Sequence, residues 1–140
     1  MYHRNVHAYK AKSLQAELSV ADPHRVIQLM MQSVLERLAQ AKGAIERQDL
    51  VAKGQAVAKA QALLRGLQDA LDLSQGQIAD DLYALYDYMN ERIWQAGIEL
   101  SPLLLDEVTT LMLTIKSAWD QIPEAAKQEG YQLRQQHGAL

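Results

Sequence analysis

The chain of 140 residues contains no cysteine. This absence excludes disulfides, thiolate metal sites and cysteine nucleophiles. The sequence also lacks any run of about 18 apolar residues, and its first residues, MYHRNVHAYKAKS, lack the apolar core of a signal peptide. We therefore expect a cytoplasmic protein without membrane insertion, long enough to bury one hydrophobic core as a single domain.

Basic charge is scarce as well, because the formal net charge is -3. A nucleic-acid partner is not expected, since such a partner usually requires a basic face. The charge is unevenly divided: residues 22–67 carry 7 basic and 4 acidic side chains, whereas residues 68–120 carry 2 basic and 10 acidic ones. Two interpretations stay open, namely weak attraction between the two packed halves and an acidic surface that selects partners by charge.

Patterns typical of catalysis are missing. A di-iron helical bundle needs Glu-x-x-His on two helices, and no histidine follows three residues after Glu36, Glu91 or Glu107. There is no glycine-rich phosphate loop or nucleophile elbow. His3 and His7 have a metal-binding spacing only if that segment is helical, and His24 lacks the Lys and Gly neighbours of a phospho-accepting histidine. We predict a protein that binds other molecules, without enzymatic activity, cofactor or metal.

Helix start signals divide the chain. Asp22-Pro23 and Ser101-Pro102 each place a capping side chain before a proline at the first helical position. Asp49 is expected to cap a second helix, and Ser74 with Gln77 has the spacing of a capping box for a third. Apolar residues then recur at three- and four-residue steps. The third helix, capped by Ser74, is expected to run to about residue 96, and the other three cover about residues 23–47, 50–71 and 102–120.

These four amphipathic segments and their short connections predict an all-α fold, an antiparallel up-and-down four-helix bundle. Residues 1–21 are expected to form a mobile N-terminal arm, residues 22–120 the bundle, and residues 121–140 a short flexible C-terminal tail. Within the third helix, the stretch DLYALYDYMNERI, residues 81–93, has more apolar surface than one core contact requires. Leu82, Leu85, Met89 and Ala96 are predicted to face the core.

Four pieces of the sequence resemble the FliS family of flagellin-specific export chaperones, over about residues 8–120. They are Ala8-Tyr9, the helix start ADPHRVIQLM, the segment LYDYMNERI and the closing Ser117-Ala118-Trp119. One departure is Met30-Met31-Gln32-Ser33, where family members commonly carry Leu-Tyr-Asp-Gly. The resemblance implies a cytoplasmic four-helix bundle that binds the C-terminal region of flagellin, prevents its premature polymerisation and helps to present it to the flagellar export gate.

The resemblance also implies that an arm bearing Tyr9 covers apolar bundle surface when cargo is absent. The predicted partner-binding residues combine that arm with apolar stripes beside the expected core of the third and fourth helices. They are Tyr9, Leu14, Tyr83, Tyr86, Ile93, Leu105, Met112 and Trp119. The alternative is a helical adaptor without secretion cargo, which forms a homodimer through the same surface.

Overall fold

The computed structural model describes residues 22–122, which form four long helices and one short 3-10 turn. The helices are α2 (Pro23–Glu46), α3 (Leu50–Asp69), α4 (Gln77–Glu99) and α5 (Pro102–Asp120), with η1 (Leu73–Gln75) between α3 and α4. The residues of the predicted arm lie outside the described part of the chain, as do almost all residues of the predicted tail.

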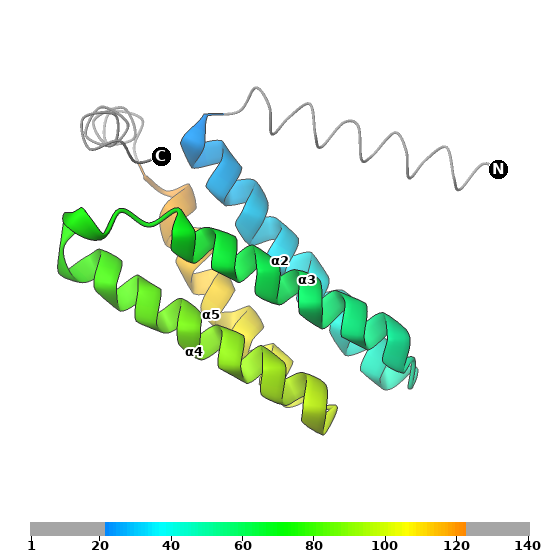
Figure 1. Ribbon diagram of the computed structural model, residues 1–140. Coiled ribbons are helices and arrows are strands. Elements are labelled where there is room, and N and C mark those ends of the chain that lie inside the picture. Colours follow the sequence, from blue (N-terminus) through cyan, green and yellow to red (C-terminus); the bar gives the residue numbers. More distant parts are fainter. Residues whose placement is uncertain (1–21, 123–140) are drawn as a thin grey trace, which may run out of the picture.

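The helices run alternately up and down, as Figure 1 shows. Helix α2 packs against α3 and α5, and α4 packs against the same two neighbours. Each helix of 19 to 24 residues is therefore held on two sides. This arrangement confirms the predicted antiparallel four-helix bundle. It also places the start of α2 and the end of α5 at one end of the bundle.

Three of the predicted helix starts are confirmed. The Asp22 carboxylate accepts the Arg25 N–H at 2.7 Å, and the Asp49 carboxylate accepts the Ala52 N–H at 3.1 Å. The Ser101 hydroxyl accepts the Leu104 N–H at 3.3 Å. Each bond satisfies one of the first-turn N–H groups that have no partner within the helix. The connections between consecutive helices are short, and this keeps neighbouring helices antiparallel.

The start of α4 differs from the prediction, because Ser74 does not cap it. The Ser74 hydroxyl donates to Asp72, the N-cap of η1, at 2.6 Å, and Gly76 occupies the N-cap of α4 with φ 89°. Only glycine adopts such a φ without strain. The end of α4 is also later than predicted: the helix passes through Gly97 and ends at Glu99, and its C-cap Leu100 is left-handed at φ 53°.

The core is built from buried side chains of all four long helices, with small residues gathered in the second half of α2 and the first half of α3. Gly66 of α3 is a point of close approach, since a Cβ there would lie 2.7 Å from the Met30 methyl carbon of α2. The fully buried large side chains are Met31, Val34, Leu38, Leu64, Leu67, Met89, Ile93, Leu105, Val108 and Met112. This continuous core fixes which faces of α4 and α5 remain available to a partner.

Candidate partner-binding surface

Four of the predicted binding residues lie in the core. Tyr86, Ile93, Leu105 and Met112 are exposed by 2% or less. Helix α4 buries Ala79, Tyr86, Met89, Ile93 and Ala96 at steps of 7, 3, 4 and 3, whereas Leu82 and Leu85 are only partly buried. The predicted inward line was thus right for Met89 and Ala96, and the expectation that Tyr86 and Ile93 lie on a neighbouring stripe was wrong.

The helix phase explains this correction. Periodicity alone cannot separate two apolar lines that lie one position apart on the same helix. Tyr86 is aromatic, yet its ring packs inside the bundle, and burial raises the pKa of its phenol to about 12. On α5 two apolar lines also lie side by side, and Leu105 is buried whereas Leu104 is only partly buried. A partner reaches Ile93, Leu105 and Met112 only if the bundle opens.

Tyr83 and Trp119 are the described candidates that keep contact with solvent. Tyr83 is 40% exposed, and Trp119 is partly buried at the end of α5. Tyr9 and Leu14 lie outside the described residues. Tyr83 is not alone, because two other large apolar side chains of α4, Trp94 and Ile98, are each 61% exposed. These two were not among the predicted binding residues, although both belong to the three- and four-residue spacing that starts at Tyr83.

We call the line of Tyr83, Asp87, Asn90, Trp94 and Ile98 the α4 stripe. Its apolar members are Tyr83, Trp94 and Ile98, and Asp87 and Asn90 are polar. It runs along the α3 side of α4. Gln68 of α3, which is buried, donates through its amide to the Tyr83 carbonyl at 3.0 Å and to Asp87 Oδ1 at 2.7 Å. The side-chain oxygen of Asn90 is buried without a hydrogen-bond partner. The α4 stripe therefore combines exposed apolar surface with an unsatisfied acceptor.

The opposite side of α4 is closed by charge. Glu107 of α5 accepts bonds from the Tyr88 hydroxyl and from Arg92 Nε, each at 2.7 Å. These two hydrogen bonds, first the one from Tyr88, lower the pKa of the Glu107 carboxyl below its ordinary value. Tyr88, which the sequence left without a role, thus joins α4 to α5.

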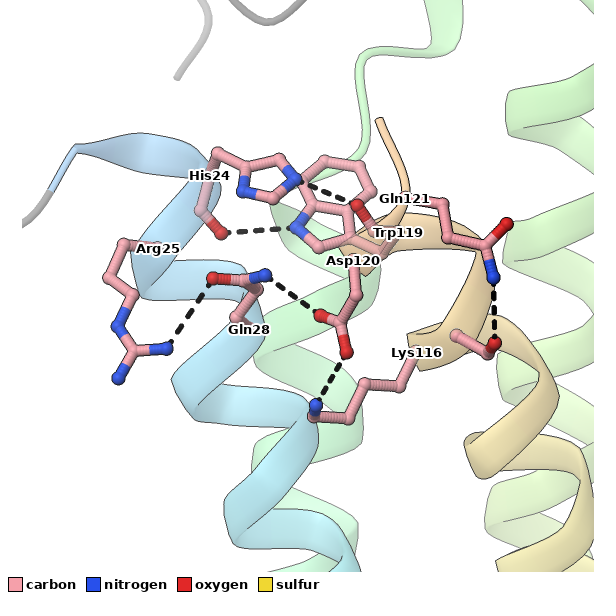
Figure 2. A network of polar contacts seen from close by, with 8 residues as sticks. His24, Arg25, Gln28, Lys116, Trp119, Asp120 and Gln121 are labelled. Atoms are coloured by element: carbon pink, nitrogen blue, oxygen red, sulfur yellow. Dashed lines mark hydrogen bonds and ion pairs between the residues drawn. The ribbon is translucent and has the colours of Figure 1, made fainter. Parts of the chain in front are cut away.

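A reciprocal contact joins the start of α2 to the end of α5, as Figure 2 shows. His24 Nε2 lies 2.8 Å from the Trp119 carbonyl, and Trp119 Nε1 donates to the His24 carbonyl at 3.0 Å. A carbonyl can only accept, so Nε2 carries the proton. The two rings stack with centroids 4.7 Å apart. Because His24 is only 3% exposed, this contact argues against a phospho-accepting role.

An apolar opening lies beside this contact, with a volume of about 50 Å³. All four long helices contribute to it, and it brings together two of the predicted binding residues, Tyr86 and Trp119. Its other lining residues are Ile27, Met31, Leu67, Ala70, Leu71, Leu82 and Ile115. The opening thus brings a predicted residue of α4 and one of α5 into a single apolar lining.

The described residues offer little for other kinds of site. Residues 22–122 hold no group of three or more His, Cys, Asp or Glu side chains placed to bind a metal. None of the helices in this range combines the length and apolar character needed to cross a bilayer. The fold, the α4 stripe and the apolar opening define an all-helical protein with exposed surface suited to holding another polypeptide.

Comparisons with known proteins give the family. Residues 5–126 match the family model described as Flagellar protein FliS. The flagellar secretion chaperone FliSB of Pseudomonas aeruginosa is 47% identical over 81% of this chain and 91% of its own. The flagellar secretion chaperones FliS of Vibrio cholerae and Salmonella typhimurium are 39% and 36% identical, over 85% and 89% of this chain and 88% and 94% of theirs. The chain belongs to the FliS family.

Proposed function

We propose that this protein is a flagellar secretion chaperone that binds the C-terminal region of flagellin in the cytoplasm and performs no bond chemistry. The observation that carries the proposal is the match to relatives named as flagellar secretion chaperones along most of the chain. By holding flagellin, the protein prevents premature polymerisation and presents the cargo to a component of the export gate.

The geometry supports a binding path for an apolar segment. The α4 stripe exposes an aromatic or aliphatic side chain at Tyr83, Trp94 and Ile98, and the apolar opening next to Trp119 offers a second contact. An amphipathic segment that becomes ordered on binding loses conformational entropy, so it needs a long contact. We assign the cargo contact to these exposed residues in place of the buried Ile93, Leu105 and Met112.

Calorimetry tests this function with a peptide from the C-terminal end of the cognate flagellin. Saturable binding is expected, and it should weaken by about tenfold or more when Tyr83 and Trp94 are both replaced by alanine. The matched control is Leu113→Ala, which removes an exposed apolar side chain from α5 outside both contacts. Absence of binding at high micromolar peptide contradicts the proposal.

The predicted arm gives a second test. If residues 1–18 compete with cargo for the apolar surface, their deletion should tighten peptide binding and increase the binding of an apolar dye. Unchanged affinity and unchanged dye binding contradict that competition. Light scattering of the free protein distinguishes the alternative function, since a tight dimer that buries the α4 stripe favours a helical adaptor.

A further inference from the structure

A groove follows the outer seam between α2 and α3. It consists of two adjoining hollows of about 390 and 280 Å³, and Arg37 and Lys59 line both of them. The first hollow has an apolar lining that includes Leu29, Met30 and Leu63. We call the two hollows together the α2–α3 groove.

Small side chains create this groove. Ala39 and Gly43 of α2 face Ala52 and Ala56 of α3 in the second hollow, where larger residues would fill the seam. A Cβ at Gly43 would lie 3.1 Å from an Arg47 guanidinium nitrogen, so that guanidinium lies across the helix at Gly43. Along α2 the lining extends from residue 29 to residue 47, which at 1.5 Å per residue is about 27 Å, the length of a helix of about 18 residues.

The charged residues of the lining are all basic, namely Arg37, Arg47 and Lys59. Among residues 22–122, ion pairs involve Lys42, Arg92 and Lys116, and none involves the three groove cations. Arg37 donates to the neutral Gln40 amide oxygen at 3.0 Å. An apolar floor edged by unpaired cations is complementary to a helix with an apolar face and acidic flanks.

The groove is separate from the surface assigned to the cargo. Only α2 and α3 line it, whereas the apolar opening is lined by all four long helices. Between them, the Met30 methyl group lies against Gly66 and closes the seam. An occupant of the groove therefore leaves the opening and the α4 stripe uncovered.

We propose that the α2–α3 groove docks an acidic amphipathic helix of a second protein, which is bound at the same time as the cargo. The apolar face of that helix covers Leu29, Met30 and Leu63, and its carboxylates pair with Arg37, Arg47 and Lys59. This inference goes beyond the proposed function, because it adds a partner that is not cargo.

The test uses two fluorescent 18-residue helical peptides with the same leucine face, one flanked by glutamates and the other by glutamines. Fluorescence anisotropy should show saturable binding of the glutamate peptide, at least tenfold tighter than that of the glutamine peptide and weaker at high salt. The double variant R37Q/K59Q should lose at least tenfold in affinity. The matched control R65Q removes an exposed arginine of α3 that does not line the groove, and should leave the affinity unchanged.

Equal affinity for both peptides overturns the inference, and so does a loss of binding in R65Q as large as in R37Q/K59Q. Displacement of the glutamate peptide by saturating flagellin peptide also overturns it, because the groove is then part of the cargo site. A dimer of the free protein, seen by sedimentation, that R37Q/K59Q dissociates has the same consequence. Failure of acidic-peptide binding with intact flagellin-peptide binding overturns this inference alone and leaves the proposed function standing.

Discussion

Within residues 22–122, the contacts of α5 with its two neighbouring helices include ion pairs, whereas those of α3 with the same two helices do not. Helix α5 is joined to α2 by Lys42–Asp106 at 3.0 Å and to α4 by Arg92–Glu107 at 2.7 Å. Helix α3 is joined to α2 through small side chains, and to α4 by donors such as Lys53 Nζ, which bonds the Gly97 carbonyl at 3.0 Å.

This difference separates closed surface from available surface. Where charges pair across a seam, as on both sides of α5, those charges are not available to a partner, although Leu103 and Leu113 of α5 remain exposed. On the α3 side, the cations of the α2–α3 groove are unpaired and the apolar residues of the α4 stripe are exposed. The α2–α3 groove and the α4 stripe therefore both flank α3. Substitution of a buried residue and of an exposed residue of the same type should therefore change stability by different amounts.

The largest effect is expected from a matched pair of isoleucines on α4. Ile93→Ala leaves a cavity in the core, so it should lower the free energy of unfolding by about 2–5 kcal/mol. Ile98→Ala removes an exposed side chain and should change it by no more than about 0.5 kcal/mol. Urea denaturation measures both values. Equal losses contradict the helix phase described for α4.

The buried phenol of Tyr86 should make stability fall in strong alkali. Its pKa is raised to about 12 in the folded state, against 10 for an ordinary tyrosine, so the folded protein keeps a proton that the unfolded chain has lost. The contribution is fully present below pH 10 and is lost as the pH rises to about 12, by up to about 3 kcal/mol. Tyr86→Phe should show a shallower alkaline decline than the exposed control Tyr83→Phe.

Because of the contact between His24 and Trp119, substitution of Trp119 should lower stability more than substitution of Trp94. Trp119→Phe leaves the His24 carbonyl without its indole donor and removes part of the ring stack, which should cost about 1–3 kcal/mol. Trp94→Phe alters an exposed side chain and should be nearly neutral for stability. Thermal unfolding followed by circular dichroism compares the two. A neutral Trp119→Phe contradicts a structural role for the contact.

The smallest expected change in stability comes from replacing two glycines of α3 by alanine. A Cβ at Gly54 meets nothing within 4 Å, so Gly54→Ala should stabilise the helix by about 0.5–1 kcal/mol. Gly66→Ala should gain less, because its methyl group has to displace the Met30 side chain. Denaturant midpoints of the two variants measure the difference. A larger gain at Gly66 contradicts the close approach of α2 and α3.

The sequence predicted the bundle well because its signals are local. Asp22, Asp49 and Ser101 cap the helices that they were expected to cap, since a cap depends on neighbours three residues away. The end of α4 was predicted too early, at about residue 96. The helix continues through Gly97 because that glycine is buried beside Val57 of α3, a contact that cannot be seen in the sequence.

The candidate site was harder to predict. Tyr86 and Tyr83 look alike in the sequence, and only the packing of three neighbouring helices decides that one is buried and the other exposed. Trp94 and Ile98 are four residues apart, but this spacing alone does not distinguish an exposed apolar pair from a buried one. The α2–α3 groove had a partial signal in the basic balance of residues 22–67.

The most direct measurement of the central claim uses the two tryptophans of the chain as reporters. Trp94 lies in the α4 stripe and Trp119 lines the apolar opening. In a nitrogen-15 NMR titration with the C-terminal flagellin peptide, both indole N–H signals should shift and saturate together. If the peptide binds while neither indole signal moves, the cargo contact lies elsewhere and the account is contradicted.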